Sequence, residues 1–219
     1  MELRDKNGLT EQEFLAQYKP GNYERPSMTV DMLIFAAPGL HGSLTIPAFT
    51  EHAVKVLLVK RGGHPCLGQW ALPGGFVNPT ETVTQAAYRE LEEETGVTNV
   101  PLTQLYTFSQ PGRDPRTWVM SCAHVALLDT ASLSLKAGDD ADNAAWFDIG
   151  LKILHSGKNN RYYKLILTNE NTELSAFLEC PLGTFDERTC KVLENNGLAF
   201  DHAKMILCGL LNLLNLTKH

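Results

Sequence analysis

The 219-residue sequence lacks the cysteine patterns that mark a disulfide-stapled or zinc-binding protein. It contains five cysteines, an odd number, and no two of them form a C-x-x-C pair. We therefore expect buried, reduced thiols in a cytoplasmic protein. The cysteines are Cys66, Cys122, Cys180, Cys190 and Cys208.

Long hydrophobic runs and excess positive charge are also missing. The N-terminus, MELRDKNGLTEQEF, has no apolar signal core, and the most apolar segment, MILCGLLNLLNL, is too short and asparagine-broken to cross a bilayer. Lys and Arg number 19 against 25 Asp and Glu, which gives a net charge of -6. We therefore expect neither a nucleic-acid partner nor a membrane partner, although local arginines can still bind phosphate.

The apolar content of 43% is ample for a substantial core. Short apolar runs bounded by Gly and Pro predict five strands around one long helix, and no repeat or low-complexity linker divides them. This order suits an α/β sandwich with a mixed sheet. The expected strands are residues 29–36, 53–60, 70–77, 102–108 and 117–128.

The long helix is predicted from its end signals. Asn78 is the expected N-cap, and Pro79 suits the first helical position. Glu81 falls where a capping box places its acid, and Gly96 offers the left-handed residue that ends a helix. Between these ends an apolar stripe at four-residue spacing is free to pack on the core.

Four glutamates crowd the last turns of this helix, at positions 90, 92, 93 and 94. Like charges at helical spacing repel, and carboxylates near a helix C-terminus oppose its dipole, at about 0.3–1 kcal/mol each. Glu90, Glu93 and Glu94 share one face, whereas Glu92 projects away, and Arg89 can reach Glu93. Three carboxylates on one face suit Mg²⁺ or Mn²⁺, although an isolated run of glutamates is usually a solvated face.

The surroundings favour the metal site. Gly75 is followed after five residues by Glu81, and after seven more by RELEEETGV at residues 89–97. This stretch resembles, at every fixed position, the Nudix box G-x5-E-x7-R-E-U-x-E-E-x-G-U, in which U is aliphatic. The chain thus resembles the MutT/Nudix hydrolases. That implies a Nudix α/β/α sandwich with a mixed β-sheet, and hydrolysis of a nucleoside diphosphate linked to another group X.

The resemblance also implies roles for individual residues. Glu90, Glu93 and Glu94 would be the metal ligands, joined by the backbone carbonyl of Gly74. Arg89 would orient a glutamate rather than touch the substrate. Mg²⁺ (or Mn²⁺) would relieve the glutamate repulsion, attract the pyrophosphate and lower the pKa of the attacking water.

A second charged cluster lies in SQPGRDPR, residues 109–116, between two expected strands. Arginine suits bidentate phosphate recognition, but Arg113 and Asp114 can equally brace a turn. Together with TVDMLIF and LAFDHAKMIL, this loop resembles the ADP-ribose pyrophosphatase branch of the family. The resemblance implies that Arg113 and Arg116 contact the diphosphate or the terminal ribose, with Asp114 beside them or only bracing them.

We therefore expect hydrolysis of ADP-ribose to AMP and ribose 5-phosphate. An ADP-sugar, NADH, a dinucleoside polyphosphate or a nucleoside triphosphate remains an alternative substrate. The same branch contains regulators with a C-terminal winged helix, so the rival function is a non-catalytic sensor of ADP-ribose or another NAD-related metabolite. The complete set of box carboxylates, and a single apolar helix after AFDH with no room for a DNA-binding module, favour the enzyme.

The general base stays open between a box glutamate and the loop acids Asp139, Asp140 and Asp142, which are also typical of a surface turn. His202 and His64 are weaker candidates for the site. A histidine in the first turn of an apolar helix is more often a capping or packing residue.

We expect one domain over residues 1–219, with an N-terminal extension at 1–28, an insertion at 156–197 and a C-terminal helix at 200–217. Within the insertion, RYYKLILT and TELSAFLEC predict a hairpin, and a helix is expected near residues 185–195. The hairpin would be a lid, a subunit interface or a structural flap. By resemblance, and because the C-terminal helix carries an apolar stripe, a homodimer is expected.

Overall fold

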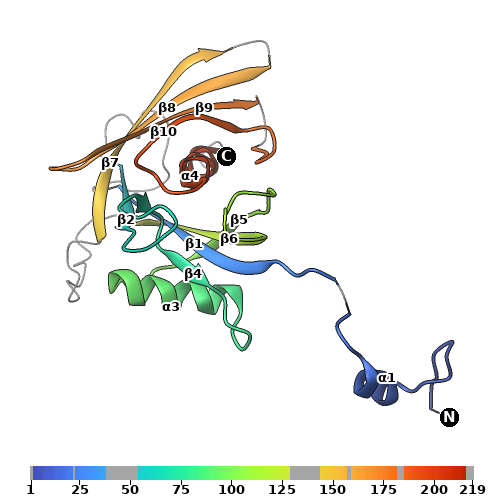
Figure 1. Ribbon diagram of the computed structural model, residues 1–219. Helices are drawn as coiled ribbons and strands as arrows, with labels where there is room; N and C mark the ends of the chain where they lie inside the picture. The colour runs from blue at the N-terminus through green and yellow to red at the C-terminus, as the bar shows by residue number, and fades with distance from the viewer. Residues whose placement is uncertain are drawn as a thin grey trace.

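The computed structural model describes residues 2–21, 23–37, 54–128, 144–156, 159–181 and 185–215. Figure 1 shows one continuous sheet with helices on its two faces and the N-terminal helix standing away from it. In chain order the elements are α1 (Glu11–Gln17), β1 (Ser27–Ala36), β2 (Lys55–Lys60), β3 (Trp70–Ala71), β4 (Gly74–Phe76), α3 (Val83–Thr95), β5 (Thr103–Phe108), β6 (Val119–Leu128), β7 (Ala144–Ser156), β8 (Asn160–Thr168), β9 (Glu173–Pro181), β10 (Lys191–Asn196) and α4 (His202–Asn215).

The sheet is mixed. Its strand order is β10-β9-β8-β7-β2-β1-β6-β5, with β3 paired to β2 and β4 paired to β1. Strands β1 and β6 run parallel, and the other pairs of described strands are antiparallel. With α3 on one face and α4 on the other, this architecture confirms the predicted α/β sandwich with a mixed sheet.

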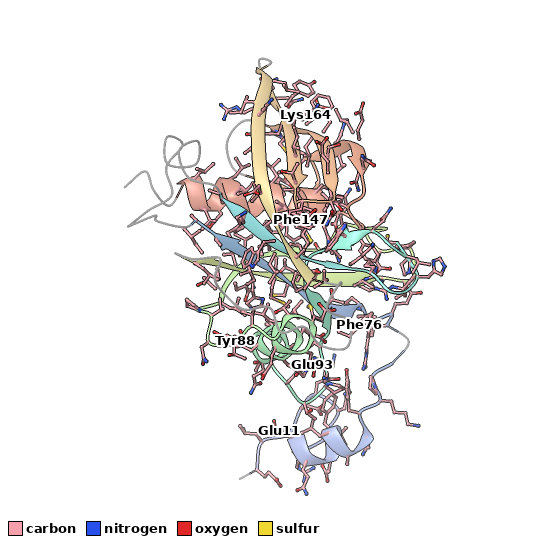
Figure 2. The ribbon with its side chains drawn as sticks, turned by 90° about the vertical axis from the view of Figure 1, so that its left-hand side faces the viewer. Glu11, Phe76, Tyr88, Glu93, Phe147 and Lys164 are labelled. Atoms are coloured by element: carbon pink, nitrogen blue, oxygen red, sulfur yellow. A yellow bond between two sulfur atoms is a disulfide. The ribbon has the colours of Figure 1, made fainter. Side chains whose placement is uncertain are left out.

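Strand β1 is buried on both faces because the two helix layers meet it from opposite sides. Val30, Met32 and Ile34 pack in one cluster with Ala86, Ala87 and Leu91 of α3. Leu33 and Phe35, which alternate with them, pack in a second cluster with α4. Figure 2 shows Tyr88 and Glu93 of α3 on one side of the central strands and Phe147 on the other.

The C-terminal strands enclose α4. The predicted hairpin is present as β8 and β9, which are joined by a turn at residues 169–172, and β7 connects it to the central strands. Figure 1 shows β8, β9 and β10 on the far side of α4 from β1. Leu165, Leu167, Leu174 and Leu178 of the hairpin share the core cluster of α4. The apolar stripe of α4 is therefore core, covered within the chain.

Two expectations about residues 180–196 are wrong. The helix expected near residues 185–195 is a turn followed by β10, which pairs with β9. The carboxylate of Asp186 accepts the backbone N–H of Arg188, and its carbonyl accepts that of Cys190, so the chain turns there. The second wrong expectation is that all thiols are reduced: Cys180 and Cys190 form a disulfide that links β9 to this turn. Cys66, Cys122 and Cys208 are free.

Two other segments differ from the predicted strands and helices. The strand expected over residues 70–77 is divided into β3 and β4, with Leu72 and Pro73 between them. Proline has no N–H to donate to a ladder, which accounts for the interruption. The N-terminal helix α1 was not predicted; Thr10 caps it, and none of its residues is buried. Among the described residues no helix is long and apolar enough to cross a membrane.

Gly209 permits the close packing of α4 on β1. A Cβ at this position would lie 2.7 Å from Leu33 Cδ2 and 3.0 Å from Phe35 Cε2, both in the buried core. We predict that Gly209→Val lowers the free energy of unfolding by about 2 kcal/mol through overpacking, measured by denaturant titration. Gly63→Val is the control, because nothing lies within 4 Å of that position. Equal stability of the two variants would contradict this packing.

Candidate active site

A cavity of about 160 Å³ lies beside the start of α4. Residues 29–31 of β1, residues 74–76 of β4, and the loop containing Arg113, Asp114 and Arg116 line it. Arg61, Leu72, Phe200 and His202 complete the lining. The sequence-predicted arginine loop thus lies beside the glycines that lead into the box helix.

The box helix begins later than predicted. Its N-cap is Thr82, whose side chain accepts the backbone N–H of Gln85, and Gln85 returns a capping-box bond. Asn78 is therefore not the N-cap, and Pro79 precedes the helix. Glu81 accepts hydrogen bonds from the backbone and side-chain amides of Asn78, which close a turn ahead of α3. Gly96 ends the helix in the left-handed conformation, as expected.

Arg89 lies at the centre of the charged network. Its guanidinium donates to Glu81 at 2.6 and 3.0 Å, to Glu90 at 2.7 Å and to Glu93 at 3.0 Å. It also donates to the carbonyl of Phe76 at 3.0 Å, which links β4 to α3. The hydrogen bond from Arg89 lowers the pKa of Glu81 to about 2, so that carboxylate stays ionised.

Glu94 is held differently from its neighbours. Its Oε2 accepts the backbone N–H of Gly74 at 2.8 Å. Burial raises the pKa of Glu94 to about 7, and the charges of Glu90 and Asp31 add to this effect against the opposing hydrogen bond from Gly74. A carboxylate whose ionised form is disfavoured by burial and by neighbouring acids is stabilised by a cation, so the environment of Glu94 fits the binding of a divalent ion.

Glycine is required at position 75 by the contact between β4 and α3. A Cβ there would lie 2.3 Å from Glu90 Oε1. No three acidic, His or Cys side chains in the described parts of the chain converge closely enough to hold an ion by themselves. Since Glu90 and Glu93 both pair with Arg89, a metal site here also needs backbone or phosphate oxygens.

The two arginines of the loop have different environments. Arg113 is buried and donates to both carboxylate oxygens of Asp201, at 2.8 and 3.1 Å. Arg116 is 40% exposed and donates through Nη2 to Asp114 at 2.7 Å. Burial alone would raise the pKa of Asp114, but the hydrogen bonds from Arg116 outweigh it and the pKa is lowered. Arg113 thus ties the loop to α4, while Arg116 presents its guanidinium at the cavity.

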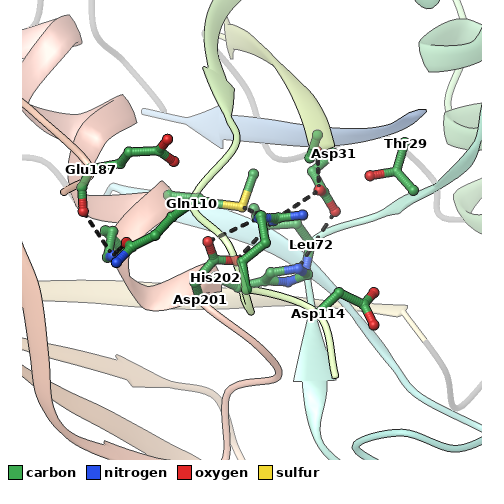
Figure 3. Close-up of polar contacts among 12 residues, drawn as sticks. Thr29, Asp31, Leu72, Gln110, Asp114, Glu187, Asp201 and His202 are labelled. Carbon is green, nitrogen blue, oxygen red and sulfur yellow. Dashed lines mark hydrogen bonds and ion pairs between the residues drawn. The ribbon is translucent and has the colours of Figure 1, made fainter. Parts of the chain in front are cut away.

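Sequence reasoning missed Asp31, which lines the cavity and lies beside His202 (Figure 3). Its carboxylate accepts a short hydrogen bond from Ser121 and lies 3.9 Å from Arg113 Nη2. His202 Nδ1 accepts the backbone N–H of Leu72 at 2.9 Å, which leaves Nε2 as the protonated nitrogen, 3.5 Å from Asp31 Oδ1. A charged residue within the apolar run TVDMLIF was the available signal.

The remaining sequence candidates are His64 and three loop acids. His64 is exposed and is not among the residues that line it. The general-base candidates Asp139, Asp140 and Asp142 lie outside the described residues. Sequence reasoning also missed Arg61 and Phe200, which form part of the cavity wall. Arg61 follows the strand expected at 53–60 and Phe200 begins the helix expected at 200–217, so neither had a pattern of its own.

The fold and the box helix define the class of protein. Residues 39–166 match the sequence model of the NUDIX domain, which is more than half of the chain. The mixed sheet, the box helix and its carboxylates agree with this match. The chain therefore belongs to the Nudix family.

Curated relatives include both enzymes and regulators. The chain is 44% identical over 110 residues to an ADP-ribose pyrophosphatase of Methanocaldococcus jannaschii, covering 50% of this chain and 64% of that protein. It is 35% identical over 125 residues to the ADPR responsive transcriptional repressor NtrR of Acinetobacter baylyi, covering 56% of this chain and 45% of the repressor. The matches thus span less than two thirds of either relative.

Two solved structures are similar. A MutT/nudix family protein from Enterococcus faecalis is 33% identical with a TM-score of 0.66, covering 94% of this chain and 70% of that one. The NUDIX domain of Shewanella oneidensis NrtR, complexed with ADP ribose, is 31% identical with a TM-score of 0.51. The match covers 64% of this chain and 84% of that one. The first likeness extends well beyond residues 39–166, so the C-terminal strands and α4 have a structural counterpart.

The raised pKa of Glu94 predicts a pH-dependent stability difference in metal-free protein. The folded state keeps a proton that the unfolded chain releases, so this contribution is fully present below the ordinary pKa of 4.5 and is lost as the pH rises through about 7. We therefore expect Glu94→Gln to gain melting temperature relative to wild type as the pH increases across this window.

The matched control is Glu92→Gln, which removes a carboxylate from the same helix but keeps the Glu94 acceptor of the Gly74 N–H. The pH-dependent gain in melting temperature should be larger in Glu94→Gln than in this control. Mg²⁺ added at the higher pH should stabilise wild type more than Glu94→Gln, since only wild type keeps every box carboxylate. Parallel pH profiles of wild type and Glu94→Gln would contradict the raised pKa of Glu94.

Proposed function

We infer that this protein is a Mg²⁺- or Mn²⁺-dependent hydrolase of the pyrophosphate bond in a nucleoside diphosphate linked to X. The proposed substrate is ADP-ribose, and the products are AMP and ribose 5-phosphate. The observation that carries the proposal is the contact of Glu90 and Glu94 with Gly75 and Gly74, two glycines that also line a cavity together with arginines. The likeness to an ADP-ribose pyrophosphatase supports the choice of substrate.

In this proposal the box carboxylates and the carbonyl of Gly74 hold the cations. When bound, the cations would lower the pKa of a water molecule and offset charge on the diphosphate. Glu90, Glu93 and Glu94 are the side-chain ligands, and Arg89 keeps Glu90 and Glu93 oriented through its hydrogen bonds. Gly75 lets the chain approach Glu90 closely.

The arginine loop divides its tasks. Arg116 binds phosphate oxygens, because its guanidinium is partly exposed at the cavity and Asp114 fixes its direction. Arg113 holds Asp201 and with it the start of α4, so it positions the wall of the cavity. A buried guanidinium that already has a bidentate partner has little capacity left for substrate.

A non-catalytic sensor of ADP-ribose or another NAD-related metabolite is the second candidate. The identity to a transcriptional repressor that responds to ADPR favours it. The complete carboxylate set of the box favours the enzyme instead, since a sensor needs no cation-activated water. The further proposals are a small-molecule nucleotide as the partner, with no nucleic acid bound, and a cytoplasmic location. A homodimer is proposed from the family resemblance alone, because the apolar stripe of α4 is covered within the chain.

The decisive measurement is chromatography of products after incubation with ADP-ribose and Mg²⁺. We expect AMP from wild type and none without metal. Glu94→Gln should lower the rate of AMP formation at least about 100-fold, because mutating even the outer partners of a metal site lowers activity or metal affinity 10–100-fold. Glu92→Gln should keep wild-type activity. Saturable ADP-ribose binding without AMP would favour the sensor. If neither turnover nor binding is observed, ADP-ribose is excluded as the ligand, and other nucleoside diphosphate derivatives are assayed next.

The role of Arg116 has a matched control in Arg188. In both, the arginine backbone N–H lies 2.9 Å from an aspartate two residues earlier, and Nη2 lies 2.7 or 2.8 Å from that carboxylate. Of these two arginines, Arg116 lines the cavity and Arg188 does not. We predict that Arg116→Gln raises KM for ADP-ribose about tenfold, from the loss of one charge-assisted hydrogen bond, whereas Arg188→Gln leaves KM unchanged. Equal KM values in the two variants would exclude Arg116 as a substrate contact.

A further inference from the structure

The wall of the cavity contains an aromatic ring shared by two arginines. The Cζ of Arg61 lies 4.9 Å from the centroid of the Phe200 ring, and that of Arg116 lies 5.9 Å from it. Arg116 also lies 5.2 Å from the ring of Phe76. All four residues line the cavity. Cations over an aromatic face are attracted by its quadrupole, so the ring holds both guanidiniums in place.

The two guanidiniums differ in their protein partners. Arg116 is paired with Asp114. Arg61 donates through Nε to the carbonyl of Pro65 at 2.8 Å, and no carboxylate in the described parts of the chain forms an ion pair with it. Its outer nitrogens are thus available to a ligand. Of the two cations over this ring, only Arg116 has a carboxylate partner among the described residues, which leaves the charge of Arg61 for an anion in the cavity.

The backbone fixes the position of the ring. Phe200 has a φ of +49°, a conformation that side-chain-bearing residues rarely adopt. The preceding segment is anchored to β3, because the carbonyl of Gly197 accepts the Trp70 N–H and the Ala199 N–H donates to the Trp70 carbonyl. The helix that follows is anchored by His202 on Leu72. An unfavourable conformation held from both sides is typical of a functional position.

The size of the cavity limits what it can hold. Its volume of about 160 Å³ is smaller than the roughly 300–1,000 Å³ of sites that enclose whole small molecules. A diphosphate with an adjoining sugar portion therefore fits better than an entire dinucleotide. Charge and size together favour an anionic phosphate group between the arginines, with the rest of the nucleotide projecting outward.

We propose that Arg61 is a phosphate-binding residue and that Phe200 is the positioning residue which holds Arg61 and Arg116 as one anion-binding pair. The proposal deepens the function given above and rests on it for the identity of the ligand, a nucleoside diphosphate derivative. Phe200 lies outside the residues that match the NUDIX domain. The C-terminal part of the chain thereby contributes to substrate affinity.

The test compares Phe200→Leu, Phe200→Tyr, Arg61→Gln and the double variant Arg61→Gln/Phe200→Leu. We expect Arg61→Gln and Phe200→Leu each to raise KM for ADP-ribose about tenfold, with kcat within about twofold of wild type. Phe200→Tyr keeps an aromatic face and should keep the wild-type KM. The double variant should lose less than the product of the two single effects, because Phe200 acts partly through Arg61. Phe14→Leu, at an exposed phenylalanine of α1, is the matched control and should equal wild type.

Calorimetric binding of ADP, inorganic pyrophosphate and adenosine separates this inference from the proposed function. If wild type binds ADP and pyrophosphate without hydrolysing ADP-ribose, about tenfold weaker binding of both in Phe200→Leu still supports the inference. Unchanged KM and unchanged ADP binding in Phe200→Leu overturn it even if hydrolysis is confirmed. Weaker adenosine binding with unchanged pyrophosphate binding indicates a base-stacking ring and also overturns it. The inference is also overturned if wild type binds neither ADP nor pyrophosphate.

Discussion

The contact between β4 and the end of α3 is the constraint on which the rest of the site depends. Negative charge is concentrated at that helix end, and β4 supplies what the helix cannot: the Gly74 N–H for Glu94 and a strand without a side chain at Gly75, where Glu90 fits. Arg89 spans the same gap by bonding the carbonyl of Phe76 together with the acids. Glycine–glycine at the strand is therefore as necessary to the site as the glutamates.

A second group of contacts at the cavity is organised around Asp31, which pairs with Gly74 across β1 and β4. This buried carboxylate gathers Ser121 from β6, Arg113 from the loop and His202 from α4. Arg113 in turn holds Asp201, so three separate segments are fixed relative to β1. The C-terminal half of the chain is joined to the cavity through these contacts and through the packing of α4 in the main core.

Much of the fold could be predicted because its signals are local. Box spacing and helical periodicity identified α3, and apolar runs identified β1, β2, β5, β6 and the hairpin. Features that depend on distant partners could not be predicted. Asp31 contacts His202 from the other end of the sequence, β10 pairs with the edge of β9, and the proposed role of the Phe200 ring depends on Arg61.

Even local signals failed where two residues competed for one task. Asn78 and Thr82 are both residue types that cap helices. Thr82 is the N-cap of the box helix, where Gln85 completes its capping box. Glu81 was then free to bind Arg89 rather than the helix start. The arginine loop shows the same ambiguity: its spacing indicates charge near phosphate, but burial decides that Arg113 faces Asp201 and Arg116 faces the cavity.

The isolated position of Phe200 in the sequence bears on how such a protein diversifies. The residues proposed for bond cleavage occupy one short stretch, whereas the ring that orients the arginines comes from a segment more than a hundred residues later. Under the proposed function, changes around that ring would retune ligand preference while the hydrolytic stretch remained intact. Descendants of one ancestral sequence could thereby acquire new substrates through drift near the C-terminus alone.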